Sequence, residues 1–353
     1  RVLFRSAGLD KAINKAVEKK QTTISFPNKG ISKLPPSIGT ATDCKILNLA
    51  QNSIKVLPVE IGQLYNLEDI NLNNNEIRQL PSQFTNLRNL KNIALSYNLI
   101  TELPTNFFIY SQLRSLNLTH NRLTALPKGI GYCFELVELR LNFNEFKTIP
   151  NDIERLVNLK TLVCTHNPLM LLPPGMGALK MLDTLELSNN RIKTLPSSLS
   201  KCKALKTLKM VMNNKLEKPV KESYERKQTA QFLQDLGTSE FDALYKKDCM
   251  NNIDLFAECL GQTKKEAEDY FKRIKAEEEN ALKRKEEVQK LQEEKFREEA
   301  RIVEKGELVK AGDANKVEVC EQPKDDGAPQ EDQVKEVEEA EVPPEIGRAS
   351  CRE

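Results

Sequence analysis

The side chains of this sequence best suited to metal or nucleophilic chemistry are its two histidines and eight cysteines. His120 and His166 lie two 23-residue periods apart, so stacked strands would separate their backbones by about 10 Å, with Phe143 between them. Zinc needs four close ligands, and no cysteine joins the histidines in this column. We therefore predict no metal site and no cofactor. The cysteines form no CxxC pair, and those at apolar positions of the period, where a thiol is a small core residue, are Cys44, Cys133, Cys164 and Cys202.

The motifs of common enzyme classes are also missing from the sequence. It contains no P-loop, GxGxxG, HExxH or GxSxG motif. The region from Lys221 to Pro344 has neither the length nor the glycine pattern of a kinase or a GTPase, and the lack of CxxC pairs excludes an ordinary RING domain. We therefore predict that the chain is not an enzyme.

A column of ring-bearing side chains offers a different chemistry, the recognition of another macromolecule. Tyr97, His120, Phe143 and His166 occupy the same position in four successive periods. Stacked strands would bring them into one exposed aromatic stripe, and aromatic side chains are typical anchors of protein interfaces. The alternative is that the rings only pack against one another and the partner binds elsewhere. The mostly uncharged residues beside the stripe, which suit a protein better than a phosphate backbone, include Asn71, Asn117 and Arg140.

A strict internal period sets the position of these rings. Proline recurs every 23 residues from Pro35 to Pro219, and asparagine stands six residues before each proline from the second onward. One unit reads Leu67-x-x-Ile70-x-Leu72-x-x-Asn75-x-Ile77-x-x-Leu80-Pro81. The Ile70-x-Leu72 alternation predicts a short strand with one face inward, and Pro81 predicts a short helical or 3-10 return.

This unit resembles the leucine-rich repeat, whose periods run from about 20 to 29 residues. The LPxxIGxLxxLxxL pattern is similar to the intracellular, Ras-suppressor-like class, and the resemblance covers residues 21–219. It implies an α/β solenoid: a curved right-handed horseshoe with a parallel β-sheet on the concave face, followed by C-terminal helices and a disordered tail. It also implies that asparagine amides form a ladder between adjacent loops. The ladder residues would be Asn52, Asn75, Asn98, Asn121, Asn144, Asn167 and Asn190.

Helical patterns on both sides of the repeats predict caps for the ends of the stack. Residues 7–20 should form an amphipathic helix over the N-terminal edge. Its apolar side would carry Leu9, Ala12, Ile13, Ala16 and Val17. Helical sequence from Ser223 to Leu236 should form the C-terminal cap, with Tyr224, Ala230, Phe232, Leu233 and Leu236 as its buried residues. A second helical stretch, from Phe241 to Leu260, should pack on the cap or dock a partner.

These patterns divide the whole chain into segments. Residues 1–6 and 345–353 resemble translated sequencing-adapter DNA and are left out of the fold prediction. Residues 263–305 predict either a solvated charged helix or a weak coiled coil through which the chain self-associates. The acidic residues 306–344 predict a disordered tail. The remaining segments are the N-terminal cap at 7–20, about nine repeats at 21–219 and a helical cap at 220–262.

Composition limits where the chain acts and on what. The formal net charge of +2 gives no general preference for nucleic acid, and no long apolar run could span a membrane. Scattered cysteines without an apolar signal core predict a cytoplasmic location. We expect a scaffold or adaptor in intracellular signalling that binds a protein, such as a small GTPase, on the concave face. Two alternatives stay open: a regulatory subunit of a phosphatase or ubiquitin ligase acting through the helical tail, and binding of RNA or acidic lipids by the lysines from Lys201 to Lys221.

Overall fold

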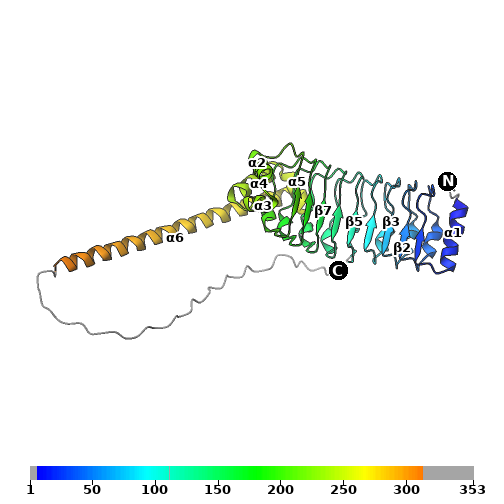
Figure 1. The fold of residues 1–353 in the computed structure, drawn as a ribbon, viewed down its shortest axis with the longest axis horizontal. Coiled ribbons are helices and arrows are strands. Elements are labelled where there is room, and N and C mark those ends of the chain that lie inside the picture. The colour runs from blue at the N-terminus through cyan, green and yellow to red at the C-terminus, as the bar shows by residue number, and fades with distance from the viewer. Residues whose placement is uncertain (1–5, 111, 313–353) are drawn as a thin grey trace, which may run out of the picture. The chain divides into compact units, whose positions relative to one another are not determined.

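The computed structural model describes residues 6–110 and 112–312 (Figure 1). Within them, each period forms one turn of a coil and contributes one three-residue strand to a 9-stranded parallel sheet. The register follows the period, because Ile70 pairs with Leu47 on one side and Ile93 on the other. The strands are β1 (Thr23–Ser25), β2 (Ile46–Asn48), β3 (Asp69–Asn71), β4 (Asn92–Ala94), β5 (Ser115–Asn117), β6 (Glu138–Arg140), β7 (Thr161–Val163), β8 (Thr184–Glu186) and β9 (Thr207–Lys209). The predicted solenoid with a parallel sheet is confirmed.

The inward side chains of the coils form one continuous hydrophobic core. In the third coil, Leu67, Ile70 and Leu72 are all buried, and the matching residues of the other coils join them. One coil has too few apolar side chains to fold alone, so burial between neighbouring coils supplies the hydrophobic free energy. A constant period is what keeps these side chains aligned from one coil to the next.

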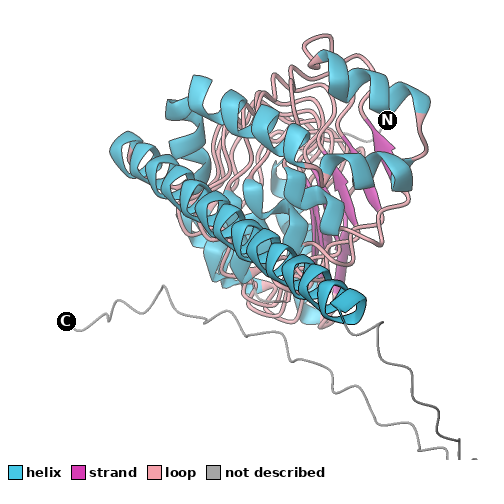
Figure 2. Cartoon of the chain, turned by 90° about the vertical axis from the view of Figure 1, so that its left-hand side faces the viewer, coloured by secondary structure: helices cyan, strands magenta, loops and turns pink. Residues whose placement is uncertain are grey.

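Short 3-10 helices follow most of the prolines and return the chain toward the next strand. Pro58 has an extended backbone, with φ −68° and ψ 151°, and η2 starts at the next residue. A Cβ on Gly62 would lie 2.4 Å from the carbonyl oxygen of Gln83, so the glycine of the LPxxIG pattern lets neighbouring returns stack closely. Seen along the stack, the strands gather on one side of the coil (Figure 2). The 3-10 helices are η1 (Pro36–Thr40), η2 (Val59–Gln63), η3 (Ser82–Asn86), η4 (Ile130–Tyr132), η5 (Asn151–Arg155), η6 (Pro174–Ala178) and η7 (Ser197–Lys201).

Helix α1 (Ser6–Glu18) packs on the first coil, at the N-terminal end of the stack (Figure 1). Leu9, Ile13 and Ala16 are buried in the same core as the repeats. The Ser37 hydroxyl donates a 2.6 Å hydrogen bond to Asp10, which ties the helix to η1. The amphipathic pattern of this segment therefore reflects packing against the first repeat.

Two short helices close the other end of the stack, α2 (Lys218–Arg226) and α3 (Thr229–Leu236). The helical cap predicted over 223–236 consists of two helices, because α2 starts earlier, with Pro219 in its first turn, and the backbone is extended at Lys227. Phe232, Leu233 and Leu236 are buried. Ala230, predicted to be buried, is exposed: it lies at the edge of the buried face of α3, in the first turn of the helix.

The next two helices, α4 (Ser239–Asn251) and α5 (Ile253–Leu260), fold back onto the flank of the repeats. The Tyr245 hydroxyl donates a 2.7 Å hydrogen bond to the carbonyl oxygen of Leu172, and the Cys259 thiol donates to that of Ile149 at 3.2 Å. Leu171 is buried with Tyr245 and other side chains of these helices in a second cluster. The stretch 241–260 is thus seated against the repeats themselves.

Helix α6 (Lys264–Gly312) starts with a capping box, in which the Thr263 backbone N–H donates to Glu266 at 2.7 Å and the Glu266 N–H donates to the Thr263 hydroxyl at 3.3 Å. The chain divides into two compact units, residues 1–280 and 281–353, and α6 contributes to both. The disordered tail was predicted from residue 306, but 306–312 are helical, because Glu, Leu, Lys and Ala continue a helix readily. Residues 313–344 of that tail and the terminal segments 1–5 and 345–353 lie outside the described residues. No described helix is long and apolar enough to cross a membrane.

Candidate functional site

A ladder of buried asparagines fixes the loops that follow the strands. The Asn121 side-chain carbonyl accepts the Ile100 N–H at 3.0 Å, and its amide nitrogen donates to the carbonyls of Leu95 at 2.9 Å and Leu118 at 3.0 Å. Each ladder amide thus bonds both its own loop and that of the preceding repeat. The same arrangement occurs at Asn52, Asn75, Asn98, Asn144, Asn167 and Asn190, and it extends to Asn213. The first repeat has Lys29 at the ladder position. Asn52 accepts the backbone N–H groups of both Lys29 and Ile31 and so bonds this first loop.

The residues just before four of these asparagines form a row of stacked rings, Tyr97–His120–Phe143–His166, which we call the aromatic row. Neighbouring ring centroids are 4.3, 3.9 and 4.0 Å apart, with interplanar angles of 18°, 9° and 14°. Tyr97 is 51% exposed and Phe143 is 38% exposed. The ring faces inside the row are covered by their neighbours, so the row presents mainly ring edges to solvent.

The backbone of the aromatic row is left-handed, which the sequence prediction did not anticipate. The φ angles of Tyr97, His120, Phe143 and His166 lie between 53° and 55°. The prediction placed these rings on the strands, but each strand is three residues long and ends before the ring-bearing residue. The rings therefore project from the turn that follows each strand. Asparagine is the residue that suits this conformation best after glycine, and Asn74 and Asn189 occupy the same position in other repeats.

The three polar residues predicted beside the row lie on the strands, and each already has a bond within the chain. Asn71 on β3 accepts the Asn73 N–H at 3.1 Å, and Asn117 on β5 accepts the Thr119 N–H at 3.0 Å. Arg140 on β6 forms an ion pair with Glu138 at 2.5 Å. Asn117 and Arg140 belong to repeats that contribute rings to the row, whereas Asn71 belongs to the repeat before Tyr97. The Glu138 carboxylate therefore compensates the positive charge of Arg140 on this surface.

Profile comparison identifies the repeated units. Residues 44–100 and 111–169 match the family model described as Leucine rich repeat, and residues 180–220 match the one described as Leucine Rich repeats (2 copies). These are leucine-rich repeats. Such repeats generally mediate protein–protein interaction, and their fold is typically a scaffold without catalytic activity.

Solved structures with leucine-rich repeats resemble part of the chain. Internalin C2 from Listeria monocytogenes is 21% identical, with a TM-score of 0.50, over 58% of this chain and 92% of its own. A leucine-rich-repeat protein of Leptospira interrogans is 30% identical, with a TM-score of 0.49, over 56% of each chain. The ectodomain of the plant receptor kinase GASSHO1/SCHENGEN3 from Arabidopsis thaliana is 29% identical, with a TM-score of 0.49, over 53% of this chain and 24% of its own. No curated protein matches the chain.

One hydrogen-bond acceptor beside the aromatic row has no donor within the described residues. Among the described residues, the Oδ1 atom of Asn142 is buried and accepts no hydrogen bond. At the same position of the third leucine-rich repeat, Asn73 accepts the N–H of Ser96 at 2.7 Å. A buried carbonyl without a donor is energetically unfavourable. Its identity as Asn gave no signal, because its bonding depends on the neighbouring strand.

The two imidazoles of the aromatic row cannot act together on one metal ion. The ring of Phe143 stacks between them, with centroids 3.9 Å from His120 and 4.0 Å from His166. Partial burial in the stack, together with the charge of His166, lowers the pKa of His120 below its ordinary value. His120 is therefore neutral at neutral pH and presents an uncharged ring edge to a partner.

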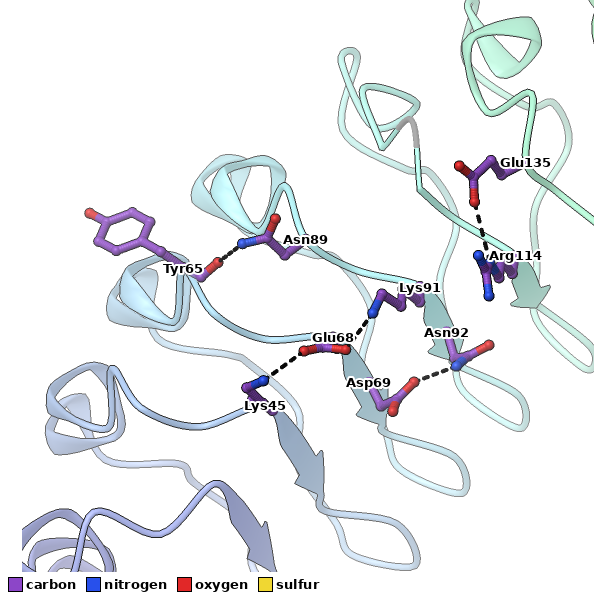
Figure 3. A network of polar contacts seen from close by, with 9 residues as sticks. All are labelled: Lys45, Tyr65, Glu68, Asp69, Asn89, Lys91, Asn92, Arg114 and Glu135. Atoms are coloured by element: carbon purple, nitrogen blue, oxygen red, sulfur yellow. Dashed lines mark hydrogen bonds and ion pairs between the residues drawn. The ribbon is translucent and has the colours of Figure 1, made fainter.

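Charged side chains at the start of the strands are compensated between neighbouring leucine-rich repeats (Figure 3). The Glu68 carboxylate lies 3.2 Å from the Lys45 ammonium and 2.6 Å from that of Lys91. Hydrogen bonds from Lys91 and then Lys45 lower the pKa of Glu68. Asp69 similarly bonds Asn92 on the next strand. This edge offers a partner less uncompensated charge than its sequence suggests.

A second series of asparagines connects the same edge. Asn66, Asn89 and Asn158 each precede the first leucine of a repeat, and their side-chain amides donate to a carbonyl of the preceding repeat. The Asn89 bond to the Tyr65 carbonyl, at 2.7 Å, is visible in Figure 3. The recurrence of Asn directly before Leu67, Leu90 and Leu159 is the sequence signal that could have revealed it.

Proposed function

We propose that the chain is an interaction scaffold or adaptor whose protein partner binds along the aromatic row and the strand surface beside it. The observation that carries the proposal is a run of stacked, exposed rings at backbone positions that favour asparagine. A left-handed backbone is unfavourable for a bulky residue by about 1–2 kcal/mol. Stacking offsets part of this cost for Tyr97 and Phe143, so the rings give the fold little net advantage over asparagine, and strained residues of this kind concentrate at functional sites.

The chemistry of this surface suits a protein segment with exposed backbone groups. Ring edges carry partial positive charge and contact apolar groups and carbonyl oxygens well. The side-chain carbonyl of Asn142, which lies next to Phe143 in the chain, has no donor among the described residues, and rotation of the side chain would let it accept an N–H group of the partner. A peptide backbone offers both kinds of group. The phosphate backbone of a nucleic acid instead requires free cations, and Arg140 is paired with Glu138.

The alternative of RNA or acidic-lipid binding by the C-terminal lysines receives less support. Lys206 lies 2.8 Å from Asp183, and Lys209 lies 2.6 Å from Glu186. These pairs weaken the field that a phosphate group would encounter.

The cysteines bear on where the chain acts. Among the described residues six cysteines are free and buried, which is typical of a reducing compartment. This supports a cytoplasmic role in signalling, with a partner such as a small GTPase.

The test compares captured proteins between variants that keep the fold. We would change Tyr97 and Phe143 to Asn together, because other repeats carry Asn at this position with the same backbone. The matched control is Met212→Asn, which removes a 63% exposed apolar side chain from the same column outside the aromatic row. Wild type and control should capture the same partner from a cell extract, and the double variant should capture at least about tenfold less of it.

Thermal unfolding of the three proteins separates loss of binding from loss of fold. The double variant should melt close to the wild-type temperature, because asparagine suits the left-handed backbone. If the double variant and the control capture the same proteins in equal amounts, the aromatic row is not the binding surface.

A further inference from the structure

A groove that none of the described residues fills lies on the flank of the first two repeats. Its volume is about 300 Å³, and Leu34, Pro36, Lys55, Val56 and Pro58 contribute to its wall together with Ser32 and Lys33. Val56 is 70% exposed, and the nearby Val59 is 52% exposed. In the next three repeats the position of Val56 is taken by Gln79, Glu102 and Ala125, so an apolar flank does not continue along the solenoid.

The same repeat positions form a filled groove in the seventh and eighth repeats. There the residues are Leu172, Pro174, Lys193, Thr194 and Pro196. Helix α4 is seated on them, and only about 160 Å³ of space remains between α4, the start of α6 and these repeats. We call this surface, on which α4 packs, the α4 seat. Because the chain is periodic, the equivalent residues form a similar surface near the other end of the solenoid.

Three residues of α4, spaced three apart, make the polar contacts of the filled groove. Tyr245 donates to the Leu172 carbonyl at 2.7 Å. Asp248 lies 3.5 Å from the Lys193 ammonium and accepts the Thr194 hydroxyl at 3.4 Å. Asp242, three residues before Tyr245, accepts the Ser197 hydroxyl at 2.5 Å. An aromatic residue with an acid three residues later therefore recognises the leucine carbonyl and the lysine of this seat.

We propose that the groove of the first two repeats binds an acidic, amphipathic helix of a partner protein in the way that α4 binds the seventh and eighth repeats. Leu34 corresponds to Leu172 and Lys55 to Lys193, so the groove retains both groups that α4 recognises. The pair between Lys55 and Glu76 is at 3.7 Å with both side chains well exposed, so an incoming acid can displace Glu76.

Three differences between the grooves define the chemistry of the incoming helix. Val56 replaces Thr194, so the acid at the Asp248 position has no hydroxyl to bond and pairs with Lys55 alone. Val59 replaces Ser197, so the residue at the Asp242 position should be apolar. Lys33 replaces Leu171, which packs in one cluster with Cys249, so the residue at the Cys249 position should be acidic. The partner helix thus carries an apolar residue, then an aromatic residue three positions later, and two acids after a further three and four positions.

The probe is a peptide with the sequence of residues 239–251 that carries Asp242→Leu and Cys249→Glu and is held helical by a side-chain crosslink on its solvent face. Its binding to the full chain is measured by fluorescence anisotropy. We expect saturable binding that Val56→Asp and Lys55→Glu each weaken at least about tenfold. A peptide with the further change Asp248→Lys should recover binding to the Lys55→Glu chain, because the charges of the pair are exchanged.

Two control variants place the bound peptide. Ala125→Asp introduces the same charge at the same repeat position outside the groove and should leave binding unchanged. Thr194→Asp should also leave it unchanged, and weakening would mean that the peptide exchanges with α4 in its own seat. The proposal is overturned by that result, by the absence of saturable binding, or by binding indifferent to Lys55 and Val56. Concentration-dependent dimers that Val56→Asp abolishes would assign the groove to a second copy, which also overturns it.

Discussion

Two columns of residues run side by side along the solenoid and differ in almost every property. The ladder column is asparagine in each repeat from Asn52 to Asn213. The adjacent column holds Gln51, Asn74, Tyr97, His120, Phe143, His166, Asn189 and Met212. Both columns share the period and the turn, so backbone geometry alone does not explain why one is constant and the other varies.

The difference lies in what each side chain contacts. A ladder amide bonds backbone groups in two repeats, and no other side chain of its size offers a carbonyl and an amide in this arrangement. The neighbouring side chain leaves the coil toward solvent, where it contacts mainly its equivalents in adjacent repeats. Constancy along a column therefore indicates a structural role, and variation on an exposed column is where recognition can reside.

The largest expected effect is loss of one ladder residue. Asn121→Leu would leave the Ile100 N–H and the carbonyls of Leu95 and Leu118 without this partner in a buried loop. We expect the free energy of unfolding to fall by about 1–3 kcal/mol, measured by urea denaturation. The neighbouring change His120→Asn is the control and should lower it far less. Equal losses for the two variants would contradict the division into structural and recognition columns.

A smaller effect on stability is expected in the aromatic row. Phe143→Asn removes two stacking contacts, each of which stabilises the fold by about 0.5–1.5 kcal/mol. It also relieves the unfavourable left-handed backbone at this position. The two contributions oppose each other, so the free energy of unfolding should fall by no more than about 2 kcal/mol. Met212→Asn, which has no aromatic neighbour in its column, should be neutral or stabilising in the same urea titration. A loss above about 2 kcal/mol for Phe143→Asn would mean that the ring is part of the core.

Most of the repeat architecture could be predicted because it depends on contacts one period apart. The pairing of Ile70 with Leu47 and Ile93 follows from the 23-residue spacing alone. The stacking of the rings also followed from that spacing. The left-handed turn under them did not, although Asn74 and Asn189 in the same column are a recognisable signal for such a backbone.

The C-terminal helices were harder to predict because their contacts span long separations. The bond from Tyr245 to Leu172 joins residues far apart in the chain, and no period relates them. One signal was available: Thr148, Leu171 and Thr194 are small or apolar where earlier repeats carry polar residues such as Gln79 and Glu102. These three residues are buried under α4 and α5, but Val56 of the same column is apolar and exposed, so composition alone does not show which repeats are covered.

The smallest expected effect is a pH dependence of the aromatic row. Because the folded row lowers the pKa of His120, it favours the neutral imidazole, whereas the unfolded chain has the ordinary value of about 6.5. The contribution to stability is therefore fully present above about pH 6.5 and is lost as pH falls from there toward the lowered pKa. NMR titration of the imidazole in the folded chain should give a midpoint below that of the unfolded chain.

The Phe143→Asn variant tests the cause of this shift. It removes the ring that covers one face of His120 at 3.9 Å, so water reaches the imidazole and the charged form is better solvated. The midpoint should move up toward the ordinary value. His166→Asn removes the nearby imidazole charge instead and should raise the midpoint less, because desolvation is the larger cause. If the His166 change has the greater effect, the two histidines act on each other mainly through charge, and the aromatic row would respond to acid as a pair of coupled groups.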